Sequence, residues 1–197
     1  MRLFRWVGWR RSLLLGILAL AVGISAPRAV EAAGPWKAQL VDAATGQPLE
    51  GVVVLMYWIT YTGTWAGWAG GEFYDAEEVV TGQDGRFVIP ARSVFTLLPW
   101  KKITREMVIF KPGYGRAQLR GAKEWETLPP AERNARREEA AKQFEGEGVV
   151  MELPRLKTRE ERLDLLGRVT WSLVPPDRSR RMVEAKQSER AFLGLPK

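Results

Sequence analysis

Residues 41–58 read VDAATGQPLEGVVVLMYW, and residues 78–90 read EVVTGQDGRFVIP. In each segment, residues that favour extended backbone flank a turn rich in glycine, aspartate or proline, which is the usual sequence pattern of an antiparallel sheet. Glycine adopts a positive φ without strain, and proline fixes its own φ and lacks an amide donor. The residues to which we assign structural turn positions here are Gly46, Pro48, Asp84 and Gly85.

The strand expected over residues 52–58 is apolar on both of its faces. A strand in an antiparallel sheet usually alternates apolar and polar residues when one face of the sheet contacts water. This strand therefore predicts either an outer face that another part of the chain covers or an exposed apolar surface.

Length and composition favour one globular domain. The chain has 197 residues, of which 46% are hydrophobic and 27% are charged, and this is enough to bury a sizeable core. The net charge of +7 is unevenly distributed: residues 1–32 carry five arginines and one glutamate, and the rest carries 25 basic and 22 acidic side chains. Because that remainder is nearly neutral, we expect no nucleic-acid partner.

The sequence contains no histidine and no cysteine. Histidine is the usual general base near neutral pH and the commonest metal ligand, and cysteine supplies thiolate nucleophiles and ligands. Nucleophilic catalysis by Ser-His or Cys-His pairs and zinc sites built on either residue are therefore excluded. We assign no catalytic residue, no metal ligand and no cofactor.

The first 32 residues have the three-part layout of a secretory signal. A basic stretch ends at Arg11, a short apolar run extends from Ser12 to Ile24, and small residues precede Ala33. The run is shorter than the roughly 20 apolar residues that a membrane-spanning helix needs. We therefore expect cleavage before Ala33 and a periplasmic or extracellular protein. The alternative is an uncleaved segment that makes the protein a membrane-anchored accessory subunit, and only in that case do we expect a membrane partner.

Residues 59–71, ITYTGTWAGWAGG, predict a flexible loop that carries much aromatic surface. Tyr61, Trp65 and Trp68 are the candidate ligand-binding residues, because aromatic rings in such a loop stack on sugar rings or on a partner's apolar surface. The other interpretation is that these rings fold back and cover the outer face of the strand over residues 52–58.

Four carboxylates that lie close in sequence offer an alternative function. Glycosidases work with carboxylates alone, so Asp75, Glu77, Glu78 and Asp84 are the candidates for a carboxylate-dependent hydrolase. Their spacing matches no calcium-binding loop, and solvated strand and turn residues are the other interpretation. A structure in which these groups do not converge would argue against catalysis.

Two regions interrupt the strand pattern. Residues 121–148 predict an inserted charged helix, which has no strong apolar stripe. Residues 158–197 predict a helical C-terminal extension, in which Thr158 and Glu161 form a capping box. The expected organisation is a signal over residues 1–32, a β-sandwich over residues 33–157 and the extension over residues 158–197.

Three motifs in order resemble the carboxypeptidase regulatory-like family. They are DAATGQPLEGV at residues 42–52, TGQDGRF at residues 81–87 and KPGY at residues 111–114, in which Gly113 is a further turn position. The resemblance covers residues 36–153 and implies a mainly β fold: a seven-stranded antiparallel sandwich of the transthyretin-like type, a variant of the immunoglobulin-like architecture. It implies no activity, because in that family this module is not the peptidase.

The function expected from these observations is that of an exported non-catalytic β-sandwich module. Its role is binding or structural at the cell envelope, with an unknown protein or a glycan as the partner of the aromatic segment. The carboxylate-dependent hydrolase and the membrane-anchored subunit are the alternatives.

Overall fold

The computed structural model describes residues 33–94, 96 and 98–196, so the expected signal at residues 1–32 lies outside the described residues. The described part is mainly strands. In chain order the strands are β1 (Trp36–Asp42), β2 (Val53–Thr64), β3 (Gly67–Val80), β4 (Arg86–Ile89), β5 (Lys101–Phe110), β6 (Gln118–Leu119) and β7 (Val149–Leu153). The helices are α2 (Ala122–Trp125), α3 (Pro130–Glu145), α4 (Arg159–Arg168) and α5 (Arg180–Phe192), with a 3-10 turn at Pro176–Arg178.

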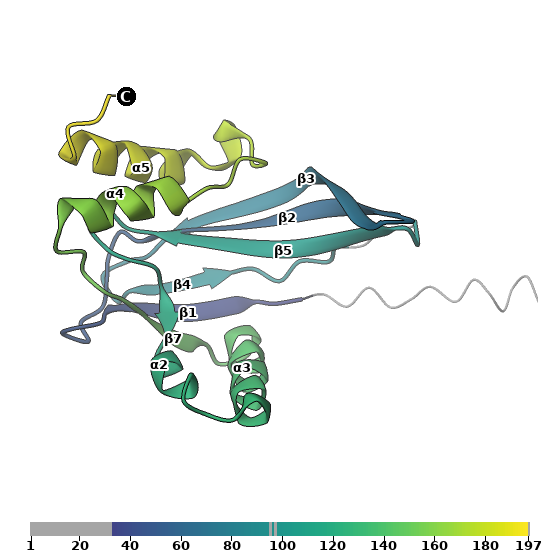
Figure 1. Cartoon of the computed structure of the whole chain (residues 1–197), viewed down its shortest axis with the longest axis horizontal. Helices are drawn as coiled ribbons and strands as arrows, with labels where there is room; N and C mark the ends of the chain where they lie inside the picture. Colours follow the sequence, from purple (N-terminus) through teal and green to yellow (C-terminus); the bar gives the residue numbers. More distant parts are fainter. Residues whose placement is uncertain (1–32, 95, 97, 197) are drawn as a thin grey trace, which may run out of the picture. The chain divides into compact units, whose positions relative to one another are not determined.

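The strands form two sheets, which confirms the predicted mainly-β class. One sheet has the order β4-β1-β7-β6 and the other has the order β3-β2-β5. Figure 1 shows the three-stranded sheet lying over the other sheet, with α4 and α5 above it and α2 and α3 on the opposite side. The two sheets thus form two layers, an arrangement consistent with a β-sandwich.

One pairing corrects the all-antiparallel prediction. Strands β1 and β7 run parallel, with Ala38 opposite Val149 and Asp42 opposite Leu153. Parallel neighbours need a long connection between them. The chain supplies one, because it passes through the other sheet and through α2 and α3 before it returns as β7. No local turn pattern encodes such a pairing.

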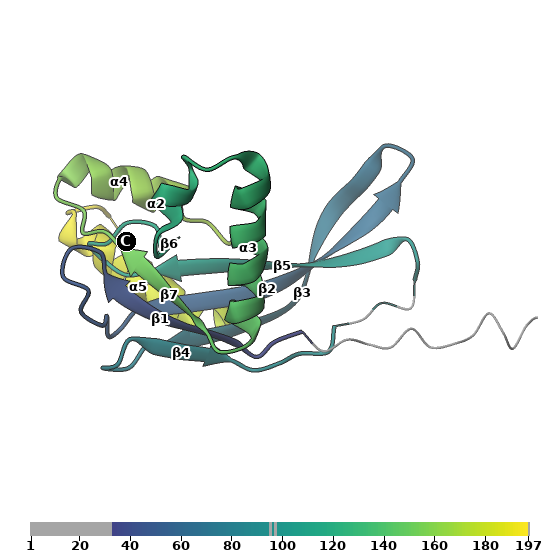
Figure 2. The ribbon, with the colours of Figure 1, turned by 90° about the horizontal axis from the view of Figure 1, so that it is seen from below.

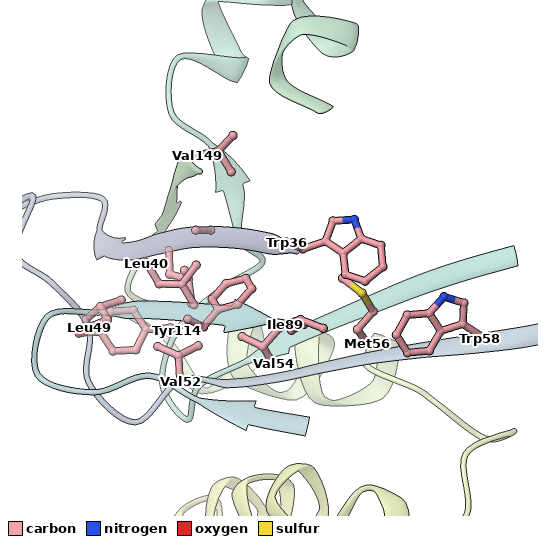
Figure 3. Close-up of a cluster of buried hydrophobic side chains, with 13 residues drawn as sticks. Trp36, Leu40, Leu49, Val52, Val54, Met56, Trp58, Ile89, Tyr114 and Val149 are labelled. Carbon is pink, nitrogen blue, oxygen red and sulfur yellow. The ribbon is translucent and has the colours of Figure 1, made fainter. Parts of the chain in front are cut away.

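The core between the sheets is built from alternate side chains of β1 and β2. Trp36 and Trp58 are at most 2% exposed, and their ring centroids are 5.8 Å apart. Figure 3 shows Met56 beside these two rings and Leu40 farther along the same cluster. Burying large apolar side chains is the main favourable contribution to folding, at about 25 cal/mol per Å².

The outer face of β2 is covered by the C-terminal helices. Val53, Leu55, Tyr57 and Ile59 pack there in a second buried cluster. The buried residues that the C-terminal region contributes to this cluster include Leu165 and Leu166 of α4, Met182 of α5 and Leu193 directly after α5. The apolar character of β2 on both faces is therefore explained by two cores, one on each side of this central strand.

The helices belong to the same compact unit as the sheets, which contains residues 32–197. Helix α3 also contributes to the sandwich: Phe144 packs edge-on against Phe87, with ring centroids 6.3 Å apart. Its last residue, Glu145, accepts hydrogen bonds from Trp36 Nε1 and Arg105 Nη1, each at 3.0 Å. Those two hydrogen bonds, that of Arg105 first, lower the pKa of Glu145.

The turn positions lie at the ends of strands. Gly85 has a φ of 68°, and a Cβ at this position would lie 2.5 Å from the Leu40 carbonyl oxygen. The turn from β3 to β4 approaches the β1 backbone so closely that only glycine fits there. Asp84 Oδ1 accepts the amide of Arg86 at 3.0 Å. The remaining turn positions are Gly46 with a φ of 71°, Gly113 with a φ of 78° and Pro48, which bridges to Val41.

Asp42 connects the first turn to the corner that contains Tyr114. Its carboxylate is buried, and Oδ1 accepts the amides of Ala44 and Thr45 at 2.9 and 3.1 Å. The Tyr114 hydroxyl and Arg155 Nε donate to Oδ2 at 3.2 and 2.7 Å. Two of the three sequence motifs therefore meet at one carboxylate.

The stability of the protein is expected to depend on the ionisation of Asp42. The hydrogen bond from Arg155, followed by those from the amides of Ala44 and Thr45 and from Tyr114, holds the pKa of this carboxyl well below its usual range, against the effect of burial. A carboxyl whose pKa is lower in the folded state stabilises the protein above its unfolded pKa of about 3.9, and this contribution is lost as the pH falls towards the folded value.

We therefore expect the free energy of unfolding to fall as the pH drops below about 5, and Asp42→Asn to make this fall shallower. Urea unfolding at a series of acidic pH values measures both slopes. Equal slopes in the wild type and in Asp42→Asn would show that another carboxyl is responsible.

Candidate functional site

The segment predicted as a loop over residues 59–71 is a paired β-hairpin. The end of β2 pairs with the start of β3 up to Thr64 opposite Gly67, so the turn lies at Trp65 and Ala66. The glycines that suggested a loop serve the hairpin: Gly67 has a φ of 115° at the turn, and Gly70 has a φ of 70° beside a register shift. Glycine at a bulge or turn is compatible with a strand, and this is why the loop prediction is wrong.

The hairpin extends away from the rest of the sandwich. Figure 2 shows the ends of β2 and β3 projecting beyond the helices and the four-stranded sheet. Strand β5 accompanies them on the other side of β2, because Thr62 lies opposite Lys101 and the amide of Gly63 donates to the Trp100 carbonyl at 2.6 Å. Three strands thus carry the projecting end.

The aromatic side chains differ in exposure. Trp65 is fully exposed, Trp68 is 53% exposed, and Tyr61 is half-buried against the second core cluster. The rings therefore do not serve as the cover of β2, because α4 and α5 do so. Trp100, which directly precedes β5 and was not among the candidate residues, is 53% exposed beside the hairpin. We call Trp65, Trp68 and Trp100 the tryptophan tip.

Gly63 makes room for the tip. A Cβ at this position would lie 3.2 Å from the Trp100 carbonyl oxygen and 3.4 Å from Cζ3 of Trp68. The Trp68 ring therefore rests against the bare backbone of Gly63. Lys102 Nζ lies 6.0 Å from the centroid of the same ring, within the range of a cation–π contact. The tip is an ordered aromatic surface with a cation at its side.

The four candidate carboxylates do not form a catalytic pair in this structure. Asp75 and Glu77 both form ion pairs with Arg92, and Asp75 Oδ1 also accepts Arg178 Nη2 at 2.6 Å. Both carboxylates are therefore held in ion pairs with arginines.

Glu78 and Asp84 have structural partners as well. Glu78 Oε2 and Oε1 accept the amides of Arg181 and Met182 at 2.8 and 2.7 Å. These amides belong to the first turn of α5, where amide groups lack partners within the helix. A strand residue thus caps a helix whose bonded amides lie 103 and 104 residues farther along the chain. Asp84 lies in the next turn and bonds to Arg86.

The described residues contain neither a cluster of possible metal ligands nor a candidate membrane-spanning helix. Among residues 33–94, 96 and 98–196, no three acidic side chains come together in a way that could hold a metal ion. Within the same residues, no helix has both the length and the apolar character needed to cross a bilayer.

Comparisons with known proteins identify no relative of this chain. No protein-family model, curated protein or solved structure matches this chain. The function must therefore be argued from the residues and their arrangement.

Proposed function

We propose that the chain is an exported, non-catalytic β-sandwich module that binds a component of the cell envelope through the tryptophan tip. The observation that carries this proposal is the full exposure of Trp65 at the end of an ordered, projecting hairpin. A tryptophan exposes a large apolar area to water, which is unfavourable unless a partner covers it. Contiguous exposed apolar surface is characteristic of binding sites.

The finer fold assignment is part of the same proposal. We propose the transthyretin-like variant of the immunoglobulin-like sandwich and membership of the carboxypeptidase regulatory-like family. Supporting features are the division of seven strands into sheets of four and three, and the contact of Tyr114 in the third motif with Asp42 in the first. In this proposal the motifs stabilise the fold, and the projecting hairpin is the part that binds.

The non-catalytic character is supported by the chemistry of the side chains. The sequence has no histidine or cysteine. Of the candidate carboxylates, Asp75 and Glu77 form ion pairs with Arg92, and Glu78 caps α5. Asp84 accepts a backbone amide within its own turn. An uncleaved N-terminal segment would instead make the protein a membrane-anchored accessory subunit. Mass spectrometry of the mature protein isolated from whole cells separates these cases: we propose a start at Ala33, and a start at Met1 would favour the anchor.

The binding role is tested by removing the tip. We expect the double variant Trp65→Ala, Trp100→Ala to lose most of the wild-type binding to isolated cell envelopes in co-sedimentation, because exposed tryptophans often dominate the energy of binding. Both side chains are at least half exposed and belong to neither buried cluster. Its melting temperature should remain near that of the wild type, since substitutions of exposed residues rarely change stability much.

The matched control is Val88→Ala, Phe192→Ala, which removes two other exposed apolar side chains, 53% and 72% exposed, from elsewhere on the protein. This control should bind like the wild type. If the tip variant sediments as well as the control does, the tip is not the binding surface and the proposal fails.

A further inference from the structure

We infer that the partner of the tryptophan tip is the surface of an anionic lipid bilayer, with the indole rings at the level of the headgroups. The inference rests on the proposed function, because the same tip is the binding surface, and it names the ligand. It also departs from the expectation that a membrane partner would require an uncleaved N-terminal segment.

The first argument is the composition of the projecting end. Residues 59–71 and 98–105 contain no aspartate, glutamate, asparagine, glutamine or histidine. A sugar presents hydroxyl groups on every side, and specific sites for polar ligands bind such groups with a few well-placed polar side chains. The tip offers aromatic rings, threonines and cations instead. Tryptophan enriched together with lysine or arginine is the composition of membrane–water interfaces.

The second argument is the arrangement of apolar side chains around the turn. Trp65 lies at the turn itself, Trp68 lies on β3 against Gly63, and Trp100 directly precedes β5, with its carbonyl oxygen beside Gly63. Leu98, which is 39% exposed, precedes the same end of β5. These four side chains are between 39% and 100% exposed at a protruding end of the protein. Such a shape suits a broad, deformable surface such as a bilayer.

The third argument is the backbone at the tip. In the headgroup and acyl region, unpaired amide and carbonyl groups are costly. Strand β2 is central, paired with β3 up to Thr64 and with β5 up to Thr62, so the strand that leads to the turn is bonded on both sides. The Thr64 hydroxyl also donates to the Gly67 carbonyl across the turn at 2.7 Å. The central strand of the tip therefore enters a poorly hydrated layer with its backbone paired on both sides, while β3 and β5 are the edge strands of this sheet.

Charge selects the kind of lipid. Lys102 is exposed beside Trp68, and Lys101 Nζ lies 3.5 Å from Glu72, so the tip keeps a net positive charge. Arg105 is engaged by Glu145, and Arg92 by Asp75 and Glu77, so neither adds a free charge. A lysine near an anionic surface strengthens binding by roughly fivefold.

The experiment uses the absence of native cysteine from the full chain. A single cysteine introduced as Ala66→Cys at the turn carries an environment-sensitive fluorophore, and Val88→Cys on β4 carries the same label as a control. The probes are vesicles of phosphatidylcholine alone and of phosphatidylcholine with 30% phosphatidylglycerol. A label at a fixed site separates the contribution of the tip from any contribution of residues 1–32.

With anionic vesicles we expect the emission of the label at position 66 to rise and to shift to shorter wavelength, and lipids brominated on the acyl chain to quench it. The label at position 88 should not respond. Adding Trp65→Ser and Trp100→Ser to the Ala66→Cys chain should weaken binding about tenfold or more, because both rings lose their apolar contact with lipid. Adding Lys102→Ala should weaken binding to the anionic vesicles about fivefold.

Two results would overturn the inference. If the label at position 66 does not respond to either kind of vesicle while the tip still controls binding to cell envelopes, the partner is a protein or a glycan, and the proposed function survives without the lipid. If the labels at positions 66 and 88 respond equally, the protein contacts lipid through another surface. If the wild-type protein binds neither cell envelopes nor vesicles, both the proposed function and the inference fail.

Discussion

Removal of residues 158–197 is expected to abolish the stable folded state. Without α4 and α5, the outer face of β2 would expose Val53, Leu55, Tyr57 and Ile59, which are at most 5% exposed in the intact protein. Exposing a buried side chain of this size costs about 1.5–3 kcal/mol, so the four together cost roughly 8 kcal/mol. This is comparable with the whole stability of an ordinary domain, about 5–15 kcal/mol.

The measurement is thermal unfolding by circular dichroism, together with gel filtration of the shortened chain. We expect aggregation, or loss of the cooperative transition, because an exposed apolar sheet also invites association. A shortened chain that stays monomeric and melts near the wild-type temperature would show that residues 33–157 are a complete domain and that the helices are an accessory.

Replacement of Glu189 by alanine is expected to destabilise the protein by about 3–5 kcal/mol, which is typical of breaking a buried ion pair by removal of one partner. Glu189 is 2% exposed and forms a bidentate pair with Arg162, with both N–O distances 2.6 Å. It also accepts the amide of Gly113 at 3.0 Å. One carboxylate of α5 therefore holds α4 and the corner after β5 at the same time.

Urea unfolding at neutral pH measures this effect. The control is Glu184→Ala, also on α5, because Glu184 forms only an exposed pair with Arg181 at 3.6 Å. That variant should change the free energy of unfolding by less than about 1 kcal/mol. Equal losses in the two variants would mean that the buried pair does not fasten the helix to the sandwich.

The parts of the fold that were predictable from the sequence are those set by local residues. The mainly-β class follows from strand-forming runs and from glycine-containing turns such as the one at Gly85, whose positive φ is a local property. The capping box at Thr158 and Glu161 is present in the structure, and it too depends on residues within one turn of helix.

The features that were not predictable depend on residues far apart in the chain. The parallel pairing of β1 with β7 joins segments more than 100 residues apart, and so does the capping of α5 by Glu78. A single sequence marks Glu78 as an acidic residue in a strand and does not indicate which distant group it binds. The same limitation left open whether the aromatic segment covers the outer face of β2, which the C-terminal helices cover in the structure.

The candidate site contains residues that local sequence identifies and one residue whose place depends on a distant strand pairing. Tyr61, Trp65 and Trp68 were identified because aromatic residues among glycines are conspicuous. Trp100 was missed, since its proximity to Gly63 depends on the pairing of β2 with β5. The sequence did carry one signal for it, a tryptophan directly followed by Lys101 and Lys102 at the start of an apolar strand.

The central claim is that the exposed tryptophans at the end of the hairpin form the binding surface. Hydroxyl-radical footprinting of the protein, free and bound to cell envelopes, tests it at each residue. We expect Trp65 to be oxidised fastest in the free protein, because it is fully exposed, and Trp36 and Trp58 to be oxidised slowest. On binding, Trp65, Trp68 and Trp100 should become protected while the exposed Phe192 keeps its rate. Unchanged oxidation of Trp65 in the bound protein would contradict the claim.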